Sequence, residues 1–131
     1  VAHLNQTFAV PYAKIVIGLS FYGIEQVSST RYDEEYDVYR TCYYKTRDVD
    51  YGTIKELIAS GDYTECYSEE CEVPFLISKD GKTFYSYENP KGISVKCKYA
   101  IDNQFAGIMF WQSGNDHNDE LITAINISFS K

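Results

Sequence analysis

Two aromatic residues, Trp111 and Tyr22, stand where two apolar runs of the 131-residue chain give way to polar or small residues. Trp111 ends the run at residues 106–111, and Tyr22 follows the run at residues 14–19. Continuous apolar runs are typical of strands covered on both faces, and α/β folds bind ligands at the carboxyl ends of such strands. We therefore predict that Trp111 and Tyr22 line a binding site, where an indole offers a flat apolar surface and a phenol adds a hydroxyl.

Acidic side chains are common proton donors and acceptors in enzymes, but the pattern here favours structural roles for most of them. Asp116, His117 and Asp119 come just before a helical pattern, where acidic residues cap a helix and favour its first turn. Glu25, shortly after the first apolar run, is a minor candidate for a residue that lines the site.

Helix and strand patterns alternate along the chain. Residues 1–9 are expected to end a helix before Pro11, and strands are expected at 14–19, 36–46 and 106–112. Asp50 is a plausible N-cap for a helix that Gly61 stops, and residues 80–81 (DG) indicate a hairpin between strands 73–78 and 83–87. Further helices are expected at 92–103 and 118–127.

Four segments resemble, in order and spacing, the family 18 glycoside hydrolases, the chitinases and their relatives. Residues 14–23 (KIVIGLSFYG) are similar to the seventh strand of that barrel, and residues 107–116 (GIMFWQSGND) to the eighth. Residues 50–57 (DYGTIKEL) resemble a helix start in the family's insertion domain, and residues 84–96 (FYSYENPKGISVK) the return into the seventh helix.

The resemblance implies an α/β fold: the C-terminal fragment of a TIM (β/α)8 barrel, carrying an α+β insertion domain. Residues 1–24 would be the end of helix 6 and strand 7, residues 25–90 the insertion domain, and residues 91–131 helix 7, strand 8 and helix 8. The length agrees, because a complete barrel takes roughly 250 residues. The N-terminal remainder of the barrel would then be a partner of this chain.

The resemblance also implies roles for single residues. Trp111 would be the floor of the sugar subsite beside the cleaved bond. Tyr22 would either line the cleft or cap the rim of the barrel. Ile24 stands where many members of the family carry arginine. The family's catalytic motif, Asp-x-x-Asp-x-Asp-x-Glu, is absent from this sequence, and the acidic residues at 33–37 and 48–50 have a different spacing. No catalytic residue is therefore expected in this chain, and no cofactor or metal is expected.

The net charge of −7 argues against nucleic acid or an anionic membrane as a partner, because both require clustered lysine and arginine. No apolar stretch approaches the roughly 20 residues of a membrane-spanning helix. A neutral sugar polymer does not require clustered basic residues. The family resemblance implies that chitin or N-acetylglucosamine oligosaccharides are the partners.

Four cysteines and two glycosylation sequons favour a secreted protein. We expect a local disulfide between Cys66 and Cys71, with Cys42 and Cys97 as the other candidate pair, although four cysteines allow three pairings. Zinc is the alternative, but the spacing lacks paired C-x-x-C motifs. The candidate glycosylation sites are Asn5 and Asn126.

Three functions remain open from the sequence. The first is the C-terminal part of a secreted chitinase, which the family resemblance implies to be a substrate-assisted, retaining hydrolase of β-1,4-linked N-acetylglucosamine polymers. The second is a chitinase-like lectin that binds the sugar without hydrolysis. The third is a stand-alone interaction module built on the insertion domain.

Overall fold

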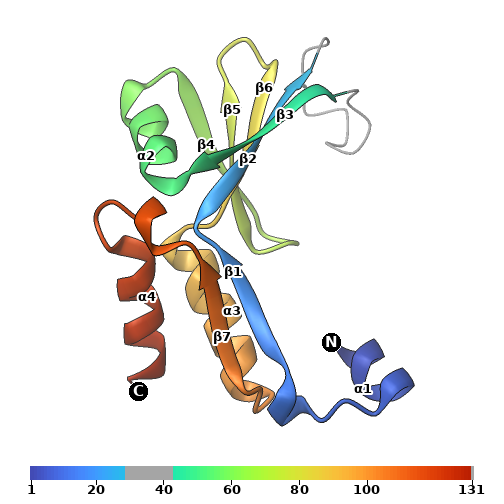
Figure 1. Ribbon diagram of the computed structural model, residues 1–131. Coiled ribbons are helices and arrows are strands. Elements are labelled where there is room, and N and C mark those ends of the chain that lie inside the picture. The colour runs from blue at the N-terminus through green and yellow to red at the C-terminus, as the bar shows by residue number, and fades with distance from the viewer. Residues whose placement is uncertain (29–42, 131) are drawn as a thin grey trace.

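A computed structural model describes residues 1–28 and 43–130. Two sheets are joined end to end, and the chain passes from one directly into the other (Figure 1). The first is a parallel pair of strands, β1 (Val16–Ser20) and β7 (Gly107–Trp111). The second is antiparallel and has the strand order β3-β2-β6-β5-β4. Its strands are β2 (Tyr22–Ser28), β3 (Tyr43–Asp50), β4 (Tyr63–Ser68), β5 (Val73–Ser78) and β6 (Thr83–Ser86).

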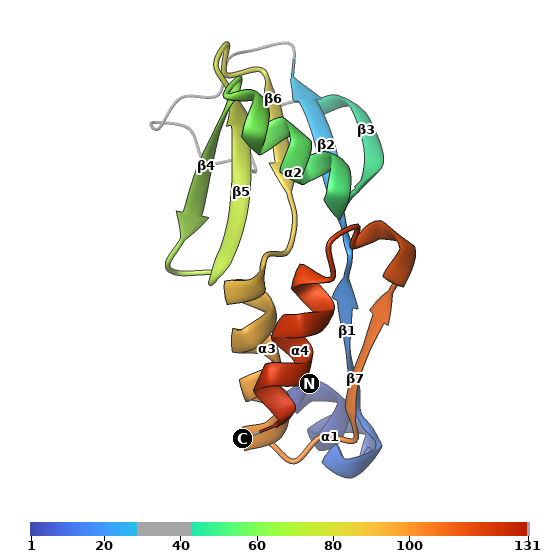
Figure 2. The ribbon, with the colours of Figure 1, turned by 90° about the vertical axis from the view of Figure 1, so that its left-hand side faces the viewer.

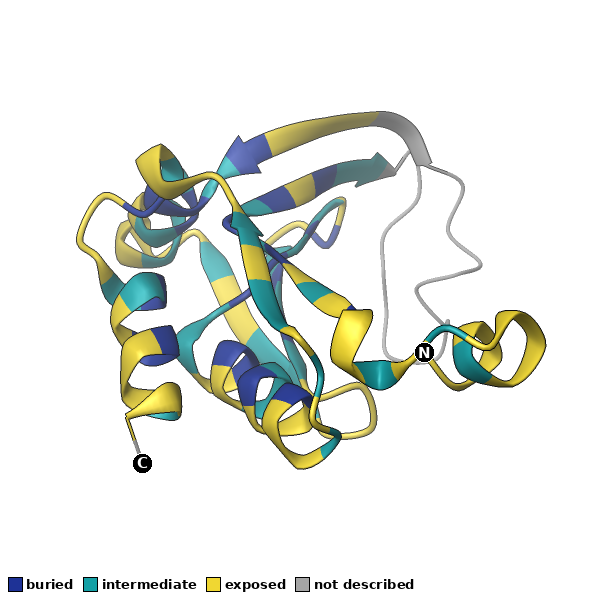
Figure 3. Cartoon of the chain, turned by 60° about the horizontal axis from the view of Figure 1, so that its bottom comes forward, coloured by how far each residue is buried: buried dark blue, intermediate teal, exposed yellow. Residues whose placement is uncertain are grey.

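Helices pack on both sheets. Helix α2 (Tyr51–Ser60) lies against the antiparallel sheet, whereas α3 (Pro90–Asp102) packs on β1 and β7 with α4 (Glu120–Phe129) beside it (Figure 2). Helix α1 (Ala2–Phe8) has no buried residue and lies away from the other elements (Figure 3). Short 3-10 turns at Tyr12–Lys14 and Ser113–Asn115 precede β1 and follow β7.

Local signals set several of these boundaries as predicted. The Asp50 side chain accepts a 2.7 Å hydrogen bond from the backbone N–H of Thr53 and so caps α2, and Gly61 ends the helix in the left-handed conformation. Gly81 has a positive φ of 71° in the turn between β5 and β6, which confirms the predicted hairpin.

Within the described chain the two apolar runs are covered on one face only. Residues aligned across β1 and β7 share a face, so Leu19 and Phe110 point toward α3 while Val16, Met109 and Trp111 lie on the other side. Leu19 is buried, but Val16 is 49% exposed and Met109 is 51% exposed. This face is bare because the described chain places helices on one side of the pair only.

Two strands differ from the prediction. The strand expected at 36–46 is observed as β3 from Tyr43 to Asp50, and residues 36–42 lie outside the described residues. Strand β2 was not predicted from the sequence. Its alternation is inverted, because Gly23 and Glu25 are buried while Ile24 between them is 37% exposed.

The Cys66–Cys71 disulfide is absent, because Cys71 is a free thiol on the turn between β4 and β5. Ser68 and Val73 are the last paired residues before that turn, and Cys66 lies two residues farther along β4, opposite Phe75. Cys66 therefore lies about 7 Å along β4 from Ser68, whereas Cys71 is on the turn that follows Ser68. A disulfide needs its Cα atoms within roughly 7 Å of each other and its Cβ atoms facing each other. Cys97 is also a free thiol, buried in the core, and Cys42 lies outside the described residues.

No helix among the described residues is long and apolar enough to cross a membrane. The same residues contain no group of histidine, cysteine and acidic side chains arranged to hold a metal ion.

Candidate binding site

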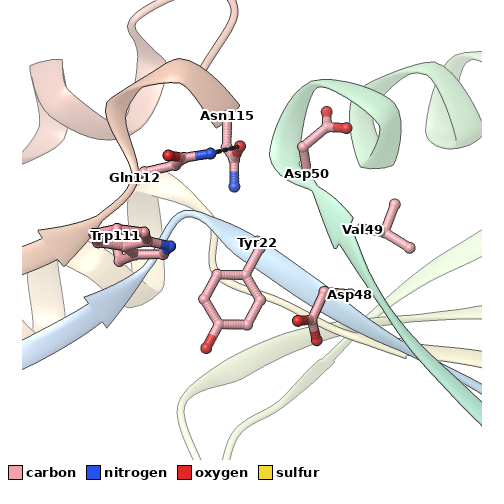
Figure 4. A pocket seen from close by; sticks show the side chains of 7 residues that line it. All are labelled: Tyr22, Asp48, Val49, Asp50, Trp111, Gln112 and Asn115. Atoms are coloured by element: carbon pink, nitrogen blue, oxygen red, sulfur yellow. Dashed lines mark hydrogen bonds between the residues drawn. The ribbon is translucent and has the colours of Figure 1, made fainter.

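Trp111 and Tyr22, predicted separately from two distant runs, line one pocket of about 350 Å³ (Figure 4). The indole of Trp111 is 64% exposed, although tryptophan is usually among the more buried residues. The pocket lies where the carboxyl ends of β1 and β7 meet the antiparallel sheet. Its seven lining residues are Tyr22, Asp48, Val49, Asp50, Trp111, Gln112 and Asn115.

Phe21 fixes the geometry of this junction. Its side chain is fully buried and stacks on Phe110, with ring centroids 4.6 Å apart and an angle of 12° between the ring planes. Its backbone N–H donates to the carbonyl of Trp111 at 2.8 Å, and its own carbonyl accepts from the N–H of Tyr51 at 3.3 Å. One residue therefore connects the strand that carries Trp111 to the start of α2.

Gly23 allows β2 to pass close to its neighbours beside the pocket. A Cβ atom at this position would lie 2.9 Å from the carbonyl oxygen of Ser86 and 2.9 Å from Cδ1 of Ile54. Because the first of these is a backbone atom, only glycine fits here without moving the strand. Tyr22, the residue before Gly23, lies between Trp111 and Asp48 (Figure 4).

The polar side of the pocket comes from two elements. Gln112 and Asn115 follow β7, and the Gln112 side-chain amide donates to Asn115 at 3.3 Å (Figure 4). The peptide bond between Trp111 and Gln112 is cis. Asp48 and Asp50 come from the end of β3.

Asp50 is held in its ionised form. Partial burial acts to raise its pKa, but hydrogen bonds from the backbone and side chain of Thr53 and the nearby imidazole of His117 outweigh burial, and the pKa lies below its ordinary value. Both carboxylate oxygens accept hydrogen bonds from Thr53, at 2.7 and 2.9 Å. A carboxylate that binds protons this weakly is a poor general acid near neutral pH.

The remaining acidic candidates have structural roles or lie apart from the pocket. Asp116 is 5% exposed and accepts hydrogen bonds from the backbone N–H groups of Glu120, Leu121 and Ile122 at 2.9 to 3.1 Å, so it caps α4 as expected. Asp119 makes no side-chain cap.

Glu25 is buried and does not line the pocket. It accepts hydrogen bonds from Tyr85 and Arg47, each at 2.5 Å. The minor role suggested for Glu25 in the site is therefore wrong.

A second pocket, of about 180 Å³, adjoins the first at Tyr22. Its walls are mainly apolar and include Ile24 and Pro74, and Glu88 provides a buried carboxylate. Tyr22 lines both pockets and is the one residue that their linings share.

Sequence reasoning missed four polar residues of the first pocket as site residues. Gln112 and Asn115 could have been found, because they directly follow a strand end where α/β folds place ligands. Asp50 was recognised only as a helix cap. Asp48 could not be found, because its place depends on the pairing of β3 with the unpredicted strand β2.

A family model for the glycosyl hydrolases of family 18 matches residues 2–116. The chain belongs to this family. It is 26% identical over 118 residues to chitinase A1 of Niallia circulans, covering 86% of this chain and 17% of that protein. It is 28% identical over 144 aligned positions to chitinase B of Serratia marcescens, covering 92% of this chain and 29% of that protein.

The fold agrees with the family. A family 18 chitinase from Cycas revoluta, solved in complex with (GlcNAc)4, superimposes with a TM-score of 0.81 at 16% sequence identity. The similarity covers 95% of this chain and 36% of the Cycas chain. The present chain spans less than a third of the length of each of these two curated relatives, and its α/β fold is similar to part of a chitinase.

Proposed function

We propose that this chain is the C-terminal part of a chitinase that hydrolyses β-1,4-linked N-acetylglucosamine polymers. In this proposal Trp111 is the floor of the cleft and Tyr22 is part of its wall. The observation that carries it is the 64% exposed indole beside an open pocket, at the strand end where a family 18 fold binds ligands. A sugar ring stacks its C–H face on an indole while its hydroxyl groups meet polar side chains such as Gln112.

We further propose that β1 and β7 are strands 7 and 8 of a TIM barrel, and that residues 25–90 form its insertion domain. The bare apolar face of Val16 and Met109 supports this, because parallel strands are normally covered on both faces. The N-terminal remainder of the barrel would cover it. Strand β2 begins at Tyr22, so the second sheet starts two residues before the boundary at 24 drawn from the sequence.

The mechanism proposed for the whole protein is retaining and substrate-assisted. The acetamido oxygen of the bound sugar attacks its own anomeric carbon, while a glutamic acid outside this chain protonates the departing glycosidic oxygen. Water then opens the cyclic intermediate and restores the configuration. Within this chain, Trp111 would hold the reacting ring and Tyr22 would orient it. Asp50 would contribute no proton, since its pKa is lowered.

Activity measurements on the isolated chain and on the whole protein test whether this chain binds the sugar without supplying the proton donor. The whole protein should release reducing sugar from a chitooligosaccharide, and the isolated 131-residue chain should not exceed the uncatalysed rate. Trp111→Ala in the whole protein should reduce kcat/KM, whereas Met109→Ala on the same bare face should have a smaller effect. Hydrolysis by the isolated chain would refute the proposal.

A chitinase-like lectin is the second candidate, because the exposed indole of Trp111 beside the pocket is a stacking surface that binding alone would use. The two candidates share the binding site and differ in turnover alone. Binding of (GlcNAc)4 that depends on Trp111, without any hydrolysis by the whole protein, would favour the lectin.

We also propose that the protein is secreted and glycosylated. Asn126 lies on the exposed side of α4, whereas the side-chain amide of Asn5 donates to the carbonyl of Val10 at 3.0 Å. Asn126 is therefore the more accessible sequon. Expression in a eukaryotic secretory host should give a mass that falls on enzymatic removal of N-glycans and that Asn126→Gln lowers more than Asn5→Gln.

A further inference from the structure

The charge of the pocket has a consequence for the kind of sugar that it accepts. Asp48 and Asp50 are two of its seven lining residues, and no lysine or arginine lines it within the described chain. Ile24, on the strand beside Asp48, adds no charge. The pocket therefore presents two negative charges to a ligand that, if it is fully acetylated, has none.

Asp48 is the carboxylate that is available to a ligand. Asp50 uses both oxygens to bind Thr53, but Asp48 is exposed on the edge strand β3, and Arg47 next to it is engaged with Glu25. The Asp48 side chain points to the pocket on the same side as Tyr22 (Figure 4). A cation placed in the pocket would interact with Asp48 without displacing the salt bridge between Arg47 and Glu25.

We propose that this site prefers chitin chains in which a ring beside the one on Trp111 carries a free, protonated amine, so that partially deacetylated chitin is bound more tightly than the fully acetylated polymer, with Asp48 setting the preference. The proposal rests on the proposed function, since the sugar must lie across Trp111 and Tyr22. Removal of an acetyl group replaces a neutral amide by an ammonium group, which the carboxylate of Asp48 attracts. Because Asp48 is exposed, the effect is modest.

The test is calorimetric titration of the whole protein with two tetrasaccharides, (GlcNAc)4 and a partially deacetylated analogue, at a pH that keeps the amine protonated. The wild type should bind the deacetylated sugar about two- to fivefold more tightly. Asp48→Asn should bring this ratio close to one. Asp48→Lys should reverse the ratio, and circular dichroism should show both variants folded.

Asp102→Asn is the matched control, because it removes another exposed negative charge, at the far end of α3. It should leave the ratio as in the wild type. High salt should reduce the wild-type ratio, since the Debye length falls from about 30 Å at 0.01 M to about 3 Å at 1 M.

The proposal is overturned if (GlcNAc)4 binds in a Trp111-dependent manner but the ratio is near one in the wild type, or if Asp48→Asn leaves it unchanged. If neither sugar binds, the proposed function itself fails.

Discussion

The backbone N–H of Phe21 donates a 2.8 Å hydrogen bond to the carbonyl oxygen of Trp111. Trp111, the last residue of β7, is thereby linked to Phe21, the residue just before the antiparallel sheet begins. The two rings next to this bond, those of Phe21 and Phe110, stack on each other. The position of the exposed indole thus depends on a buried aromatic pair beneath it.

Phe21→Ala should lower the free energy of unfolding by about 3–5 kcal/mol, because it removes a fully buried ring and its stacking on Phe110. Urea denaturation followed by circular dichroism measures this change. Phe8→Ala is the control, since Phe8 is 64% exposed, and it should change the stability by less than about 0.5 kcal/mol. Equal effects of the two substitutions would contradict the assigned role of Phe21.

Gly23→Ala should destabilise the protein by about 1–3 kcal/mol, because the added methyl group meets the backbone oxygen of Ser86 at 2.9 Å. Gly18→Ala is the matched control on β1. Its methyl group would lie 3.6 Å from the sulfur of Met109, an ordinary contact, so little change is expected. Thermal denaturation of both variants measures the difference, and a stable Gly23→Ala protein would show that β2 has room to move.

Asp116→Ala should cost about 1–3 kcal/mol, since three backbone N–H groups at the start of α4 lose their acceptor. Asp119→Asn tests the neighbouring acid, which makes no cap and has a positive φ of 57° that asparagine tolerates. It should be close to neutral. Hydrogen exchange of the first-turn amides of α4 should accelerate in Asp116→Ala alone, and faster exchange in Asp119→Asn would contradict this assignment.

Stability should fall as the pH rises above about 10, the usual pKa of tyrosine. Burial, and then hydrogen bonding to a carboxylate, raise the pKa of three tyrosines in the folded protein. The unfolded chain then loses these protons at a lower pH than the folded one, so their stabilisation is complete below about pH 10 and is lost above it. The donor and acceptor pairs are Tyr51 and Glu120, Tyr85 and Glu25, and Tyr87 and Glu65.

Urea titrations between about pH 9 and about pH 11 measure this loss. Tyr87→Phe should make the decline less steep, because one proton fewer is released on unfolding. Tyr99→Phe, at a side chain that is 49% exposed, should leave the slope unchanged. A stability that stays constant over this range would show that these tyrosines are not protected by folding.

Local chemistry accounts for the parts of the fold that the sequence predicted. The Asp50 cap, the Gly61 stop and the turn at Gly81 each depend on a residue type that suits its local conformation better than most others do. The helix expected at 92–103 begins two residues earlier, at Pro90 with Asn89 as its cap, and proline at the first helical position was an available signal.

Pairwise packing accounts for what the sequence did not predict. In β2 the polar Glu25 is buried and the apolar Ile24 is exposed, because Tyr85 and Arg47 satisfy the Glu25 carboxylate. An alternation rule that places isoleucine inside and glutamate outside cannot find such a strand. Trp111 and Tyr22 were found because strand ends are visible in one sequence, whereas Asp48 reaches the pocket only through the β2–β3 register.

The affinity of the whole protein for (GlcNAc)4 tests the central claim most directly, with Trp111→Ala and Trp111→Phe compared by titration calorimetry. We expect Trp111→Ala to weaken binding by about 30-fold, as for a central aromatic contact worth about 2 kcal/mol, and Trp111→Phe to recover part of the loss. Full affinity in a folded Trp111→Ala protein would contradict the role of Trp111 as the floor of the cleft.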